Sequence, residues 1–470
     1  MVTWPGVRPG VAHGPPGDGN VRAVTALRRA VALGFAGTTA LAAGGRVAGA
    51  LPVRDRIGLP QGEAAAGLLV AYFGIGLLVA AWWGLGRQLR GAEPPTVRQL
   101  LATFGVWAAP LLLAPPLFSR DVYSYLAQGT MVGSGIDAYA YGPDRLGGPL
   151  AAEVPVMWRS TPAPYGPLFL ALARVTAHGG ITGMRLMALL GVGLLVVFLP
   201  LIARRCGADP AAALWLGALN PLVLLHLVGG AHNDAVMLGL LGAGLVAGLR
   251  AGRWPVVGAA VLVTLAALVK APAAMGLLAV AALWADRLTG RARWARAAAG
   301  TAGVALATTV AVTAATGTGY GWIDALTTPA SASNWSLTNM LGRLTGPLVP
   351  AATWHRVGLV AAAAAIVTVW LLRRRLGPVY ALGLSLVALA LLGPAIRPWY
   401  LLWGLVPIAA AAPNGRARRW AAAGSGLFAM AVLPDGFPAT GRQLALATAG
   451  GALAALTVGG LSALRLVRTA

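Results

Sequence analysis

Charge is scarce in this chain of 470 residues, because only 10% of them are charged. Soluble domains carry about 25%, so a conventional water-soluble fold is excluded. Cysteine is scarcer still: Cys206 is the only one, which rules out an internal disulfide and a thiolate metal cluster. Lys270 is likewise the only lysine. The sequence also lacks an Asp-x-Asp motif of the kind that binds a metal–nucleotide complex.

Long apolar runs fill most of the chain, of which 58% is hydrophobic. A helix needs about 20 apolar residues to cross a bilayer, and such runs recur from about residue 30 to the C-terminus. The pattern predicts an all-α, polytopic transmembrane bundle of about 12–14 spans. The spans are expected near 30–48, 64–86, 99–117, 183–203, 210–228, 235–250, 255–269, 272–286, 297–316, 355–372, 378–393, 398–413, 420–434 and 443–464.

Arginines cluster at alternate ends of these runs, as at Arg373, Arg374 and Arg375. With the N-terminus inside, the positive-inside rule places nearly every such cluster, and both termini, in the cytoplasm. The net charge of +23 therefore indicates membrane topology, not nucleic-acid binding. A multi-pass protein of the cell membrane is expected, with a disordered cytoplasmic tail over 1–29 and a transmembrane domain over 30–470.

The largest loop on the predicted outer side, 118–182, is rich in polar and aromatic residues. Asp121 begins it, directly after an apolar run, and a carboxylate at a membrane boundary is costly unless it is paired or used. Asp121 is therefore the candidate catalytic base, with a salt bridge to Arg120 as the alternative. Aromatic rings stack on sugars, although they also mark membrane interfaces. The candidate sugar-binding residues of this loop are Arg120, Tyr123, Tyr125, Asp137, Tyr139 and Tyr165. Residues 165–178 are expected to form a short helix at the outer interface.

Three further outer segments carry candidate binding residues. His232, Asn233 and Asp234 lie between two apolar runs and suit hydroxyl or phosphate recognition; a metal site or a helix N-cap is the alternative. Lys270 and Arg397 lie at span ends, where each could hold a lipid phosphate, and snorkelling to the interface is the alternative for the lysine. Trp399 and Tyr400 could stack on a sugar, pack on a prenyl chain or anchor the interface. The polar segment 329–343 could cover the site or bind an acceptor.

The motifs Arg-Asp-Val-Tyr-Ser-Tyr (120–125), His-Asn-Asp (232–234), Lys-Ala-Pro (270–272) and Arg-Pro-Trp-Tyr (397–400) together resemble a known family. It is the polyprenol-phosphate-mannose-dependent α-1,6-mannosyltransferases of actinobacterial cell envelopes, in the GT-C superfamily, and the resemblance covers about 100–405. It implies a polyprenyl monophosphomannose donor and a lipid-anchored α-1,6-mannan acceptor of lipomannan type, meeting among membrane lipids on the extracytoplasmic face. It also implies that the catalytic aspartate of the first large outer loop is Asp121.

Sugar transfer from such a donor requires few catalytic groups. A polyprenyl phosphate leaves as a stable anion, so one base, Asp121, and cations on the phosphate, Lys270 and Arg397 with Arg120 as a further candidate, are enough. A β-linked donor and an α-linked product mean inversion in one displacement, and no cofactor is expected, since no metal motif is present. The alternatives are a lipid or sugar transporter or flippase, which predicts mid-bilayer ions and a repeat, and a structural partner in envelope or carotenoid biosynthesis.

Overall fold

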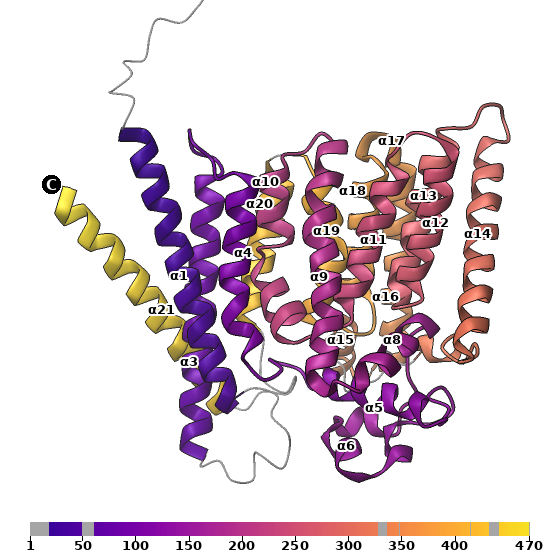
Figure 1. Ribbon diagram of the computed structural model, residues 1–470, viewed down its shortest axis with the longest axis horizontal. Helices are drawn as coiled ribbons and strands as arrows, with labels where there is room; N and C mark the ends of the chain where they lie inside the picture. Colours follow the sequence, from indigo (N-terminus) through magenta and orange to yellow (C-terminus); the bar gives the residue numbers. More distant parts are fainter. Residues whose placement is uncertain are drawn as a thin grey trace, which may run out of the picture.

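The computed structural model describes residues 18–48, 61–327, 336–346, 348–413, 415–431 and 441–469. Every regular element in these ranges is a helix, which confirms the all-α fold. Most of the helices stand side by side as one bundle (Figure 1).

Six described helices are long and apolar enough to cross a membrane, or seven if the bent pair η2–α11 is counted as one span. The six are α1 (Asp18–Ala48), α3 (Gln61–Gln88), α9 (Gly180–Arg205), α14 (Arg293–Thr316), α16 (Ala351–Leu371) and α21 (Gly441–Thr469). The multi-pass prediction is confirmed, whereas length and composition support fewer crossings than the predicted 12–14.

Shorter helices account for the difference, because they coincide with the remaining predicted spans. They are α4 (Val97–Leu112), α10 (Pro210–Gly217), η2 (Val223–Gly229), α11 (Asp234–Gly248), α12 (Arg253–Ala267), η3 (Ala271–Met275), α13 (Gly276–Ala285), α18 (Pro378–Leu392), η5 (Pro398–Tyr400), α19 (Leu401–Ala411) and α20 (Arg416–Met430). Figure 1 shows α4, α11, α12 and α18 running alongside the longer helices. At 15 or 16 residues each, these four are about a turn short of a full crossing.

The start of α1 corrects the predicted tail over 1–29. Helix α1 begins at Asp18, so residues 18–29 are helical and not disordered. The reason is local: this stretch is built mainly of Ala, Leu, Val and Arg, and alanine, leucine and arginine are strong helix formers. Residues 1–17 lie outside the described part of the chain.

The predicted span over 210–228 is a broken helix. Helix α10 ends at Gly217, and η2, which has π-type hydrogen bonding, begins at Val223. Pro221 cannot donate a backbone hydrogen bond, and the Asn220 side chain instead accepts one from the amide of Leu222 at 3.0 Å. Helix α11 then leaves η2 at an angle of 109°. The bend between η2 and α11 lies within the buried segment 229–234.

Close packing of α9 against α11 fixes where that buried segment ends. A Cβ atom on Gly191 would lie 2.3 Å from the backbone of Ala235 and Val236, so only glycine permits this approach. The start of α11, which holds Asp234, is therefore held rigidly against α9.

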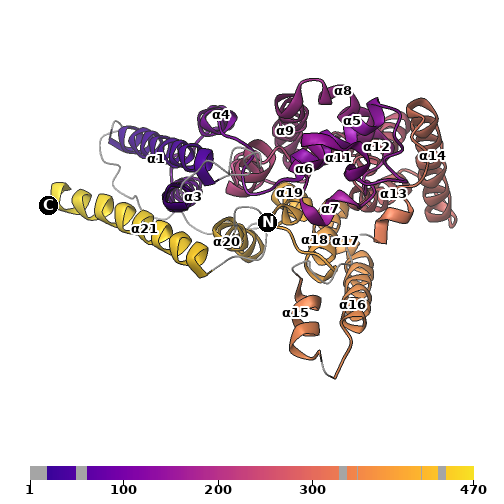
Figure 2. The ribbon, with the colours of Figure 1, turned by 90° about the horizontal axis from the view of Figure 1, so that it is seen from below.

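Short helices between α4 and α9 form a cap at one end of the bundle. They are α5 (Asp121–Gly133), η1 (Pro143–Leu146), α6 (Gly148–Glu153), α7 (Val156–Arg159) and α8 (Pro167–Ala177). Helix α8 is the short helix predicted at 165–178, and it packs on α5 so closely that a Cβ on Gly129 would lie 2.4 Å from the Ala173 carbonyl oxygen. Seen from below, this cap lies over α11 and α12 and away from α1, α3 and α21 (Figure 2).

Three short elements complete the fold: η4 (Asp324–Thr327), α15 (Leu337–Leu344) and α17 (Arg373–Leu376). Helix α15 covers the end of the polar segment 329–343 and packs on α16. Residues 329–335 of that segment lie outside the described part of the chain. The arginine-rich α17 lies at the opposite end of the bundle from α5 and α6 (Figure 1).

Candidate active site

A cavity of about 540 Å³ lies where the cap meets the bundle. Its walls come from α5 and the α7 region on the cap side, and from η3, α18, η5 and α19 on the bundle side. The polar and aromatic side chains that line it are Asp121, Ser124, Gln128, Trp158, Thr161, Tyr165, Lys270, Arg397, Trp399, Tyr400 and Trp403. Segments separated by almost 300 residues in sequence therefore share one pocket.

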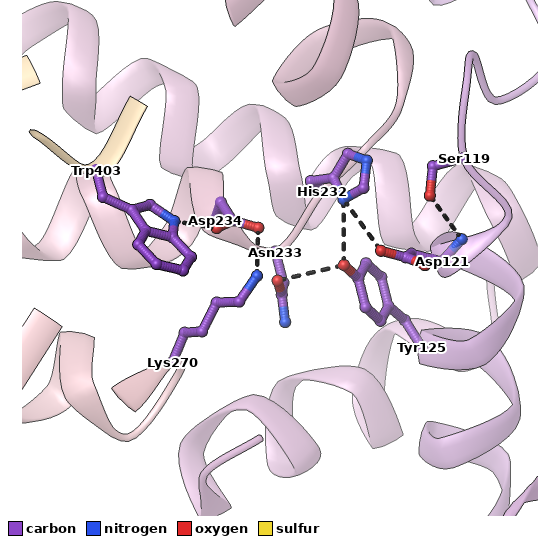
Figure 3. A network of polar contacts seen from close by, with 8 residues as sticks. All are labelled: Ser119, Asp121, Tyr125, His232, Asn233, Asp234, Lys270 and Trp403. Carbon is purple, nitrogen blue, oxygen red and sulfur yellow. Dashed lines mark hydrogen bonds and ion pairs between the residues drawn. The ribbon is translucent and has the colours of Figure 1, made fainter. Parts of the chain in front are cut away.

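Asp121 is the first residue of α5, and its carboxylate opens on the cavity. Its backbone amide is bonded to the Ser119 hydroxyl at 3.1 Å, and its Oδ2 lies 3.7 Å from His232 Nδ1 (Figure 3). The side chain keeps 22% of its surface exposed. Burial raises the pKa of the Asp121 carboxyl above its ordinary value, and the positive charges of Arg397 and Lys270 offset part of that rise.

His232 sits behind Asp121, within a cluster of rings. Its ring stacks on Trp399 with the centroids 4.0 Å apart. The Tyr125 hydroxyl lies 3.3 Å from His232 Nδ1 and donates a hydrogen bond to Asn233 Oδ1, also at 3.3 Å (Figure 3). A positive φ of 52° at Ala231 turns the chain so that these side chains face the cap.

Lys270 and Asp234 form a buried ion pair with Nζ–Oδ2 at 2.8 Å. The other carboxylate oxygen of Asp234 accepts a hydrogen bond from Trp403 Nε1 at 2.5 Å (Figure 3). Lys270 Nζ also lies 4.9 Å from the centre of the Tyr400 ring and 5.8 Å from that of Tyr165. Lys270 is thus held inside the protein by charge and rings, and the snorkelling alternative is wrong.

The beginning of α8 brings the cap to Lys270. A Cβ on Gly166 would lie 2.3 Å from the Leu268 carbonyl oxygen, and the Phe169 amide donates to that same oxygen at 3.3 Å. This contact seats Tyr165 beside the lysine. The Tyr165 ring in turn meets the Tyr125 ring edge to face, with centroids 5.5 Å apart.

The N-cap alternative for Asn233 is wrong. Asn233 occupies the position before α11, but its side chain makes no capping hydrogen bond, and Asp234 uses both carboxylate oxygens on Lys270 and Trp403. All three polar residues of 232–234 are buried, and their side chains contact Asp121, Tyr125, Lys270 and Trp403 (Figure 3).

Eight predicted binding residues lie outside the cavity wall: Tyr125, His232, Asn233 and Asp234, which form the network behind Asp121 and Lys270, and Arg120, Tyr123, Asp137 and Tyr139 in the cap. Arg120 pairs with Glu153 at 2.6 Å and donates to its backbone carbonyl oxygen, so the alternative of a salt bridge to Asp121 is wrong. Tyr123 is buried beneath the Arg120 guanidinium, whose carbon lies 4.8 Å from the centre of the tyrosine ring. Asp137 accepts from the backbone amide of Tyr139, whose hydroxyl donates to the Tyr165 carbonyl oxygen. These contacts hold the cap together and place Tyr165.

Five polar or aromatic cavity residues are not among the predicted binding residues: Ser124, Gln128, Trp158, Thr161 and Trp403. A helical period starting from Asp121 would have found Ser124 and Gln128, three and seven residues further along α5. Trp403 had no such signal, because it lies within an apolar run. In the described part of the chain, no group of three or more His, Cys, Asp or Glu side chains is placed to hold a metal ion.

The structure thus combines a helical membrane bundle with a pocket that holds a carboxylate, two cations and several aromatic rings, which is the set of groups that a membrane glycosyltransferase needs. The family model described as "Alpha-(1->6)-mannopyranosyltransferase, N-terminal domain" matches residues 31–286, and the "MptB C-terminal domain" model matches residues 333–461. The chain belongs to the alpha-(1->6)-mannopyranosyltransferase family and is a membrane glycosyltransferase.

Curated relatives agree with the family models. A probable alpha-(1->6)-mannopyranosyltransferase of Mycolicibacterium smegmatis is 35% identical, over 82% of this chain and 79% of its own length. Alpha-(1->6)-mannopyranosyltransferase A of Mycobacterium tuberculosis is 35% identical over 86% of this chain and 84% of its own, and alpha-(1->6)-mannopyranosyltransferase B of Corynebacterium glutamicum is 34% identical over 86% and 76%. No solved structure matches the chain significantly. This membership favours a transferase over the transporter and structural-partner alternatives.

Proposed function

We propose that the protein transfers mannose from polyprenyl monophosphomannose to an α-1,6-mannan acceptor of lipomannan type. Asp121 acts as the general base, and the configuration at the anomeric carbon is inverted. The observation that carries this proposal is the shared cavity, in which the Asp121 carboxylate and the cations Lys270 and Arg397 line the same 540 Å³ space. A displacement needs a base for the proton of the acceptor hydroxyl and cations for the departing phosphate, and these groups lie on different walls of the cavity.

A lipid-phosphate donor suits the composition of the bundle-side wall. Alongside Lys270 and Arg397 it includes Met275, Leu359 and Leu389, of which Leu359 belongs to the membrane-crossing α16. A prenyl chain can lie against such apolar side chains while its phosphate meets the cations. The missing Asp-x-Asp motif is consistent with a donor that carries no nucleotide.

The reaction then proceeds in a single displacement. The acceptor hydroxyl loses its proton to Asp121 while its oxygen bonds to the anomeric carbon, and the bond from that carbon to the phosphate oxygen breaks. The phosphate leaves as an anion held by Arg397 and Lys270. Asp121 afterwards releases its proton to water, and no covalent sugar–enzyme intermediate is required.

The extracytoplasmic face is the side that arginine placement supports. The cap lies at the end of the bundle opposite the arginine-rich α17 (Figure 1). Positively charged segments stay in the cytoplasm, so a cap at the other end faces out. Both chain ends would then lie in the cytoplasm of a plasma-membrane protein.

Donor choice tests the proposal with purified protein in phospholipid vesicles. Polyprenyl phosphomannose, polyprenyl phosphoglucose and GDP-mannose are offered in turn with a synthetic α-1,6-dimannoside, and products are identified by mass spectrometry and linkage analysis. We expect an inverted, α-1,6-linked trimannoside from the first donor alone. Equal transfer from GDP-mannose would contradict the assignment of the cations to a lipid phosphate.

Replacing Arg397 with alanine should weaken donor binding. A charge-assisted hydrogen bond contributes about 1.5–3 kcal/mol, so the donor KM is expected to rise roughly 10- to 100-fold while the acceptor KM changes little. The matched control is Arg145→Ala, because Arg145 belongs to the cap but lies outside the cavity, over Tyr141. A defect confined to the acceptor KM would remove Arg397 from the phosphate site.

The pH dependence of kcat/KM should show the ionisation of the Asp121 carboxyl. Asp121 must be ionised to accept a proton, so kcat/KM falls as the pH drops through its pKa. Because burial raises that pKa, the acid limb should lie above the value of about 4 for an ordinary aspartate. Since Arg397 lowers this pKa, the limb of Arg397→Ala should move to higher pH, whereas that of Arg145→Ala should stay. A shift to lower pH would contradict the assignment.

A further inference from the structure

One face of α5 lines the cavity over the first two turns of the helix. Asp121, Ser124 and Gln128 are separated by three and four residues, the spacing that places side chains above one another on a helix. All three line the cavity. The base therefore stands at the end of a short polar stripe on a rigid helix.

The two further members of this stripe are buried and lack partners. Ser124 and Gln128 are each 4% exposed, and Ser124 Oγ and Gln128 Oε1 have no hydrogen-bond partner among the described residues. Buried polar atoms are almost always satisfied, because leaving one unpaired costs about 1–3 kcal/mol. Both residues line the cavity, so a polar ligand bound there is the nearest source of the missing hydrogen bonds.

The lack of a hydrogen-bond partner is not a general feature of the polar side chains on α5. The Thr130 hydroxyl, on the same helix but off the cavity, donates to the Leu126 carbonyl oxygen at 2.8 Å. A serine within a helix can make the same back-bond to the residue four positions earlier, yet Ser124 does not. Its hydroxyl has no partner among the described residues, although the residue lines the cavity.

Trp158 adds an aromatic face to this part of the pocket. It comes from α7 in the cap, as α5 does, and is partly buried with its side chain lining the cavity. A hydroxyl, an amide and an indole are groups that bind a sugar through its hydroxyls and its apolar face. The cations belong instead to the bundle-side elements around η3 and η5.

We propose that Ser124, Gln128 and Trp158 form the acceptor subsite and set specificity for the sugar residue that presents its hydroxyl to Asp121. The inference rests on the proposed function and deepens it. The acceptor must touch the base, and Ser124 lies one turn from Asp121, about 4.5 Å along the helix. The donor is anchored by its phosphate to cations on other elements, so the stripe on α5 is left to the acceptor.

Acceptor binding without donor tests this directly. Octyl α-1,6-dimannoside is titrated calorimetrically into purified wild type, Ser124→Ala/Gln128→Leu and Thr130→Val in detergent. Two lost hydrogen bonds should raise the Kd of the double variant at least about tenfold, with Thr130→Val unchanged. The single variants Gln128→Glu and Gln128→Leu are titrated in the same way. Gln128→Glu keeps Oε1, so it should bind the dimannoside more tightly than Gln128→Leu. In the transfer assay, the double variant should raise the acceptor KM and leave the donor KM within about twofold of wild type.

Three outcomes would overturn the inference in distinguishable ways. If wild type binds the dimannoside and the double variant binds it equally well, the acceptor subsite is wrong and the proposed function stands. A donor KM that rises as much as the acceptor KM also rules out the acceptor subsite, because the stripe then holds the donor sugar. If wild type itself does not bind the dimannoside, the proposed acceptor is wrong and the subsite falls with it.

Discussion

The Asp121→Asn variant is expected to lose transfer activity by about 10²–10⁴-fold, the usual contribution of a general base. Asparagine has nearly the same shape and cannot take a proton, so the variant should fold and reach the membrane at normal levels. The turnover number should fall, while the donor KM changes little because Lys270 and Arg397 are intact. Initial rates with polyprenyl phosphomannose and an α-1,6-dimannoside provide the measurement.

Asp144→Asn is the matched control for this experiment. Asp144 lies in η1 of the same cap and is exposed, away from the cavity wall. Its removal changes the charge of the cap by the same amount and should leave the rate near that of wild type. Near-normal turnover in Asp121→Asn would remove this carboxylate from the mechanism.

The Lys270→Met variant is expected to lose both stability and activity. Methionine fills a similar volume, but the Asp234 carboxylate would then be buried with only Trp403 Nε1 beside it. Removing one partner of a buried ion pair costs about 3–5 kcal/mol, so the melting temperature of the detergent-solubilised protein should fall clearly. Donor use should fall as well, because one of the two phosphate-binding cations is gone.

A double variant separates these two effects. Lys270→Met/Asp234→Asn leaves no unpaired charge, so its melting temperature should recover toward that of wild type. Its donor KM should stay high, because no cation has been restored at this position. Recovery of both stability and donor use would show that Lys270 has a structural role only.

Apolar runs and arginine placement were enough to predict the helical bundle and the positions of its helices. They could not show the break between α10 and η2, because residues 210–228 read as one apolar run that contains only two polar side chains, Asn220 and His226. Nor could they distinguish full crossings from shorter helices. Both properties depend on how the helices pack against one another.

Candidate site residues could be picked out where a polar residue stands in apolar surroundings, as Asp121, His232 and Lys270 do. Within the cap, polar and aromatic residues are frequent, and the sequence could not tell which of their side chains face inward. Arg120 turns to Glu153, whereas Ser124 and Gln128 face the cavity. That orientation is set by the packing of α5 on α8, a tertiary contact with no local sequence signature.

The most direct test of the central claim is an electron cryomicroscopy structure of the Asp121→Asn variant with polyprenyl phosphomannose and an α-1,6-dimannoside bound. The claim predicts the donor phosphate against Lys270 and Arg397, with an acceptor hydroxyl within hydrogen-bonding distance of the side chain at position 121. A donor phosphate bound elsewhere, or a sugar that leaves this cavity empty, would contradict it.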